Sequence, residues 1–103
     1  MEKLNFKCIE AQVDRQGRWL ATAILDNGMF ANTENITGEI GTGYYCENLK
    51  TATDTVLRML KMLNIEIDKR ILLDYKDKEC KVDTCPEQFQ NEYMQERERL
   101  YSF

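Results

Sequence analysis

The side chains best suited to recognising a ligand gather near the C-terminus of this 103-residue chain. They recur at helical spacing and form one stripe, which consists of Phe89, Tyr93, Arg97 and Leu100. This stripe places a planar cation among aromatic rings, where a guanidinium can stack on a base or bind a phosphate or carboxylate with paired hydrogen bonds. The favoured alternative is that Arg97 lays its methylenes over the edge of the core and keeps its charge in water.

Trp19 and Arg99 complete the candidate binding site. Trp19 is expected to be a core anchor of a strand, with an exposed position at a binding face as the alternative. Arg99 adds a second cation that could help Arg97 to hold a small anionic nucleotide. The candidate ligand- or partner-binding residues are therefore Trp19, Phe89, Tyr93, Arg97 and Arg99.

Catalytic residues are not expected. The chain has no histidine, the most common base beside a nucleophile, and its only serine is Ser102. The remaining option is a set of carboxylates, Asp26, Asp74 and Asp77, that lie near predicted strand ends and could converge. Acidic residues in such positions are usually solvated, so the sequence favours a protein that is not an enzyme.

Cysteine spacing gives no sign of a metal centre. The four cysteines lie at positions 8, 46, 80 and 85, and the only close pair, Cys80 and Cys85, lacks the short spacing of zinc ligands. We expect free thiols, with a Cys80–Cys85 bridge only after oxidation, and we expect neither a metal nor a cofactor.

The composition is that of a water-soluble globular protein, with 43% hydrophobic residues, 31% charged residues and a net charge of -4. We expect one domain over residues 1–103, with no membrane span, because apolar runs are only a few residues long. The N-terminus has no apolar secretion signal, which favours the cytoplasm. Lysine and arginine do not cluster, so general nucleic-acid binding is not expected.

The first half of the chain reads as an antiparallel meander. Apolar residues alternate over residues 4–13, but the period slips after Cys8, which indicates a bulge or a strand buried on both faces. A turn at residues 14–17 leads to a second strand over 18–25, and Asn27-Gly28 predicts a hairpin to a third strand over 29–32. A short strand anchored by Ile36 and Ile40, and an edge strand or strand end over residues 43–46, would complete the meander.

A central helix follows, with Asn48 as its N-cap and Asn64 as the residue after its C-cap. Its apolar stripe consists of Leu49, Ala52, Val56, Met59, Leu60 and Leu63, with Leu57 beside it. Asp54 and Arg58 are spaced for an ion pair, and Met62 falls off the stripe, which makes it a candidate for an exposed contact.

The chain then returns to the sheet, with residues 71–75 as the strand core. A capping box, Thr84 to Glu87, predicts a second helix over residues 86–100. The predicted fold class is α+β: a small antiparallel sheet, with an N-terminal meander of about three to five strands, packed against one central helix, plus a C-terminal helix.

The meander followed by Asn48-Leu49-Lys50-Thr51-Ala52 at a helix start resembles HicB-type antitoxins, which carry a partial ribonuclease-H-like domain. The resemblance covers about the middle third of the chain. The Pro-Asp-Leu-Pro-Gly-Cys strand end of that family is absent, and residues 32–43 stand in its place. No functional residue is carried over.

These observations favour a non-catalytic binding or inhibitory protein. It would be a phage or mobile-element accessory factor with an anti-defence role, which blocks a host protein or sequesters a small anionic nucleotide. One alternative is a HicB-like antitoxin that neutralises a cognate toxin, and another is a small carboxylate-dependent enzyme. A homo-oligomer is also expected, because a second copy can complete a small sheet at its edge strands.

Overall fold

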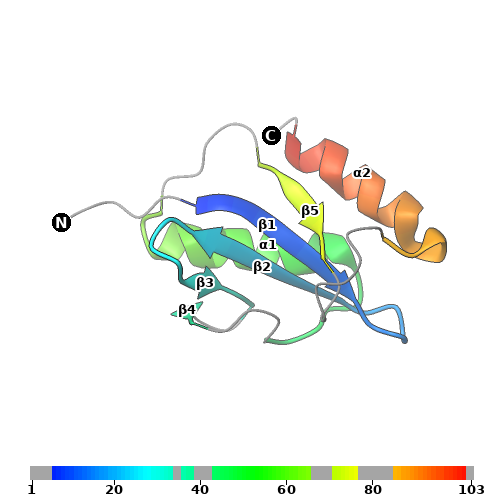
Figure 1. The fold of residues 1–103 in the computed structure, drawn as a ribbon, viewed down its shortest axis with the longest axis horizontal. Helices are drawn as coiled ribbons and strands as arrows, with labels where there is room; N and C mark the ends of the chain where they lie inside the picture. The colour runs from blue at the N-terminus through cyan, green and yellow to red at the C-terminus, as the bar shows by residue number, and fades with distance from the viewer. Residues whose placement is uncertain (1–5, 34–35, 39–42, 66–70, 77–84, 102–103) are drawn as a thin grey trace.

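The computed structural model describes residues 6–33, 36–38, 43–65, 71–76 and 85–101. Within these ranges the chain forms a five-stranded sheet in the order β4-β3-β2-β1-β5, with two α-helices beside it (Figure 1). The strands are β1 (Phe6–Val13), β2 (Trp19–Leu25), β3 (Phe30–Ala31), β4 (Ile36–Thr37) and β5 (Leu73–Tyr75). The predicted α+β fold class is confirmed.

Two tight turns build the predicted meander. Between β1 and β2, one oxygen of Asp14 accepts from the backbone N–H groups of Gln16 and Arg18, both at 2.9 Å, and Gly17 takes a positive φ of 82°. Between β2 and β3, Gly28 has a φ of 83°, and the side chain of Asn27 accepts from the next residue but one. Both turns need a left-handed residue, which explains the glycines.

The period slip in the first strand has two structural causes. The register of β1 against β2 shifts between Phe6 and Cys8, as the predicted bulge requires. Both faces of this hairpin are also buried, because Glu10 and Thr22 are paired on the face opposite the apolar core and are nearly inaccessible to solvent. The two explanations offered by the sequence therefore both apply.

β5 joins the sheet beside β1 and runs parallel to it, whereas every other pair of neighbouring strands is antiparallel. Ile9 donates its backbone N–H to the carbonyl of Leu72 at 2.9 Å, and Lys76 donates to Ala11 at 3.1 Å. The sheet is thus mixed. A parallel neighbour requires a crossover connection, and α1 lies in that connection.

α1 (Leu49–Met62) begins and ends as the sequence predicts. The side chain of Asn48 accepts from the N–H of Thr51 at 2.8 Å, and Asn64 follows the C-cap with a φ of 57°. The apolar stripe faces the sheet, and Val56 and Leu60 are fully buried. The buried residues of α1 are Leu49, Ala52, Thr53, Val56, Leu57 and Leu60.

Two details of α1 differ from the prediction, and a third agrees with it. Leu63, predicted on the buried stripe, is instead the C-cap just past the last helical residue and is exposed. Asp54 pairs with Lys50, one turn earlier, rather than with Arg58. Met62 is exposed, as predicted.

α2 (Gln90–Tyr101) follows a single 3-10 turn, η1 (Glu87–Phe89). α1 packs on β2 and β3, while α2 packs on β5 and on α1. The side chains of both helices join one core with the inward face of the sheet. The predicted capping residue Thr84 lies outside the described residues. No helix in the described ranges has the length and apolar character to cross a membrane.

Candidate functional site

The predicted site residues all lie on or against α2, but the structure divides them between two sides of this helix. One side faces the sheet and α1. The other side borders an open groove next to β5.

Trp19 and Phe89 lie on the inward side and contact each other. Trp19 is fully buried, and its ring meets that of Phe89 edge to face, with 6.1 Å between centroids. The indole N–H donates to Oε1 of Glu92 at 3.0 Å, and Oε2 of the same carboxylate accepts from the backbone N–H of Leu49 at 2.9 Å. Trp19 is therefore the core anchor that the sequence favours, and the alternative of an exposed binding position is wrong because its ring is buried.

Tyr93 is also turned inward. Its ring lies edge to face against Tyr75 at 6.2 Å, and its hydroxyl donates to the carbonyl of Leu73 at 3.1 Å. Burial raises the pKa of this phenol. The carbonyl of the preceding residue, Leu72, points at β1, so that of Leu73 points away from the sheet. Tyr93 thus covers one outward hydrogen-bonding group of an edge strand.

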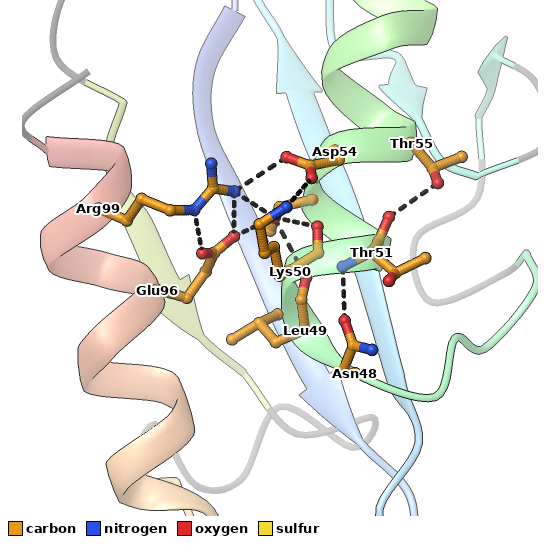
Figure 2. A network of polar contacts seen from close by, with 9 residues as sticks. Asn48, Leu49, Lys50, Thr51, Asp54, Thr55, Glu96 and Arg99 are labelled. Atoms are coloured by element: carbon orange, nitrogen blue, oxygen red, sulfur yellow. Dashed lines mark hydrogen bonds and ion pairs between the residues drawn. The ribbon is translucent and has the colours of Figure 1, made fainter.

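Arg99 belongs to an ion network between the two helices (Figure 2). Its guanidinium contacts both oxygens of Glu96, at 2.5 and 2.7 Å, and Oδ1 of Asp54 at 2.9 Å. The hydroxyl of Thr53 also donates to Glu96, whose side chain is only 5% exposed. Lys50 pairs with the other oxygen of Asp54 at 2.9 Å.

The charges in this network compensate one another. Burial acts to raise the pKa of Asp54, but hydrogen bonds from Lys50 and Arg99 outweigh it and lower that pKa below its ordinary value. The bond to Glu96 is the largest cause that raises the pKa of Arg99. A polar cleft of about 390 Å³ beside the network is lined by Asn48, Lys50, Glu92, Gln95, Glu96 and Arg99. Since the cations here already bind carboxylates, this region links the two helices and is a poor phosphate site.

The other side of α2 borders a groove of about 410 Å³. It is lined by Ile71, Leu72, Leu73, Met94, Arg97, Glu98 and Tyr101. Leu72, Met94 and Tyr101 are exposed by 52%, 46% and 50%, which is high for large apolar side chains. Arg97 is exposed, and no ion pair holds its guanidinium within the part of the chain that the structure describes.

The groove contains one of the five predicted site residues, Arg97. Sequence reasoning did not assign the other groove residues of α2, Met94, Glu98 and Tyr101, to a site, nor did it assign Leu72. The available signal was the spacing of Met94 and Tyr101, which are seven positions apart and share one face of a helix. Leu72 carried no signal, because it lies in an apolar run that reads as buried strand.

The carboxylates considered for catalysis do not converge in the described residues. Asp26 follows the end of β2, where Leu25 faces Phe6, whereas Asp74 pairs with Glu10, four residues further along β1 and on its other side. Strand geometry separates the two by roughly 16 Å. Asp77 lies outside the described residues. No group of three potential metal ligands occurs in the ranges that the structure covers.

Cys8, Cys46 and Cys85 form no disulfide with one another in the described part of the chain, and Cys80 lies outside it. Burial, followed by the charge of Glu92, raises the pKa of Cys85 to about 11, so this thiol is a poor nucleophile.

Comparison with family models, curated proteins and solved structures finds no match for the chain. The resemblance to HicB-type antitoxins therefore stays a hypothesis.

Proposed function

We propose that this protein is a non-catalytic binding protein that acts by covering a surface of another protein molecule. The observation that carries the proposal is the groove between α2 and β5, where three half-exposed apolar side chains line the same groove as Arg97, whose guanidinium has no ion pair among the described residues. Apolar surface that is concentrated in this way is typical of protein contacts. Arginine beside apolar anchors is also common among the residues that dominate binding energy.

Sequestration of a nucleotide has less support from the same geometry. Such a site would need a cation pair and a ring on which the base can stack. Arg99 is engaged by Glu96 and Asp54, and the rings of Trp19 and Tyr93 are buried. Arg97 would have to bind the phosphate alone, with the carboxylate of Glu98 beside it. We therefore favour a protein as the partner.

Site-specific photocrosslinking tests the proposal. A benzophenone amino acid replaces Met94 in the groove and, in a second variant, replaces Met62, an exposed methionine outside the groove. Cells that produce each variant are irradiated, and covalent adducts are identified by mass spectrometry. We expect a discrete protein adduct from position 94, weakened by Leu72→Glu, and none of the same mass from position 62.

Identical adducts from both positions, or none from position 94, would contradict the proposal. Native mass spectrometry of gently purified protein provides the matching test of the nucleotide alternative. A bound nucleotide that is lost in Arg97→Ala would favour that alternative over the protein partner.

A further inference from the structure

We propose that the protein molecule that fills this groove is a second copy of the chain, with the two α2 helices packed antiparallel about a two-fold axis. This inference rests on the proposed function, because it names the partner of the same groove. It also assigns the predicted homo-oligomer to a helical interface rather than to an edge of the sheet.

The order of side chains along α2 carries the argument. The helix contributes four residues to the groove, in the order Met94, Arg97, Glu98 and Tyr101. These four residues form two pairs with the same midpoint, which lies between positions 97 and 98. The apolar pair is 94 and 101, and the charged pair is 97 and 98. A two-fold interface requires that residue i of one copy meets residue j of the other and the reverse. An antiparallel pair of α2 helices centred on that point meets this condition for all four residues.

The resulting contacts are chemically complementary. Arg97 of each copy meets Glu98 of the other, which gives two equivalent ion pairs at the centre. Met94 of each copy meets Tyr101 of the other, a contact that thioethers and aromatic rings favour. Arg97 and Glu98 form no ion pair elsewhere in the described ranges, so both are available. Leu72, on the opposite wall of the groove, adds apolar surface for the second helix.

Pairing through the edge of β5 is disfavoured at the same location. The outward carbonyl of Leu73 already accepts from Tyr93, and Ile71 donates its backbone N–H to the last turn of α2 at Leu100. A strand from a second copy would have to displace these bonds. A helix beside α2 leaves them intact.

Sedimentation equilibrium of the full chain over a wide concentration series tests the interface. We expect a monomer–dimer equilibrium in the unchanged protein. Arg97→Glu and Glu98→Arg should each weaken dimerisation about tenfold or more, because each turns two attractive pairs into two repulsive ones. The double variant Arg97→Glu/Glu98→Arg should restore dimerisation to within about threefold, because the reversed pairs attract again. It also keeps the net charge of the unchanged chain.

Circular dichroism of each variant shows whether the fold is retained. A protein that stays monomeric at every concentration overturns the inference, and so does a dimer that neither single reversal weakens. If the double variant keeps its fold but does not regain dimerisation, the proposed pairing of Arg97 with Glu98 is also wrong. If photocrosslinking from position 94 yields only adducts with a different protein, the dimer inference is wrong while the proposed function is still supported.

Discussion

The indole N–H of Trp19 in β2 donates to the carboxylate of Glu92 in α2, 73 positions later in the chain. The second oxygen of that carboxylate accepts from the backbone of Leu49, at the start of α1. One side chain therefore joins the sheet to both helices. It also supplies negative charge to the N-terminus of α1, where the helix dipole favours it.

Replacement of Glu92 by alanine should destabilise the protein by about 2 kcal/mol. The change leaves a buried indole N–H and a helix N-terminal amide without their acceptors, and each unsatisfied donor carries a cost. Glutamine in place of Glu92 keeps one good acceptor and should cost about half as much. Urea unfolding followed by tryptophan fluorescence measures both, since Trp19 is the only tryptophan.

Asn91→Ala serves as the control, because Asn91 is exposed in the same turn of α2. This substitution should change the free energy of unfolding by less than about 0.5 kcal/mol. If Glu92→Ala is no more destabilising than this control, the contact with Trp19 does not stabilise the fold.

Two arginines on α2 should differ sharply in their effect on stability. Arg99→Ala removes the cation that compensates Glu96, a carboxylate only 5% exposed, and should cost about 3 kcal/mol. This value is at the low end for a broken buried pair, because the Arg99 side chain is 34% exposed. Arg97→Ala, two positions away on the exposed side, should change the free energy of unfolding by less than about 0.5 kcal/mol.

Chemical unfolding of the two variants at a concentration where the protein is monomeric measures this difference. Equal losses of stability would mean that the network in Figure 2 contributes no more than a surface charge. Arg99→Lys is informative beside them. It keeps the charge but loses the paired geometry, so its stability should fall between Arg99→Ala and the unchanged protein.

Because of Asp54, the free energy of unfolding should depend on pH in the acid range. The pKa of Asp54 is lowered in the folded state despite partial burial, because Lys50 and Arg99 bind the ionised form. A lowered pKa contributes stability above the ordinary value of 3.8, and that contribution disappears as the pH falls through the folded-state value. The difference in unfolding free energy between the unchanged protein and Asp54→Asn should thus be largest above about pH 5 and shrink below pH 3.8.

Unfolding curves at a series of pH values from neutral to acid check this prediction. Asp26→Asn, a substitution in an exposed turn, corrects for the loss of one negative charge. If the difference in unfolding free energy between the unchanged protein and Asp54→Asn stays constant down to the lowest pH, then Lys50 and Arg99 do not stabilise the ionised form of Asp54.

Much of the fold follows from local sequence signals. The slip in period after Cys8, the Asn27-Gly28 turn and the Asn48 cap each depend on a few neighbouring residues, and all three appear in the structure. The direction of β5 had no such signal, because strand direction depends on where the preceding crossover leaves the chain.

The candidate site was harder to predict for a related reason. Helical spacing placed Phe89, Tyr93 and Arg97 on one stripe, but it could not show that α2 meets both α1 and β5. Those two contacts turn Tyr93 inward and leave Arg97 in the groove. The exposure of Leu72 depends on a long-range arrangement in the same way.

Tyr93 offers a test of how α2 protects the edge of the sheet. Its hydroxyl binds the outward carbonyl of Leu73, and Tyr93→Phe removes only that bond while the ring still packs against Tyr75. We expect a loss of about 1 kcal/mol, the usual cost when a buried acceptor loses its donor. The backbone N–H of Lys76, which bonds β5 to β1, should then exchange with solvent roughly fivefold faster, as that free energy implies. Tyr44→Phe, in which the ring is 67% exposed, should leave this exchange unchanged. Equal exchange rates in all three proteins would mean that the packing of α2, and not the hydroxyl, holds β5 in the sheet.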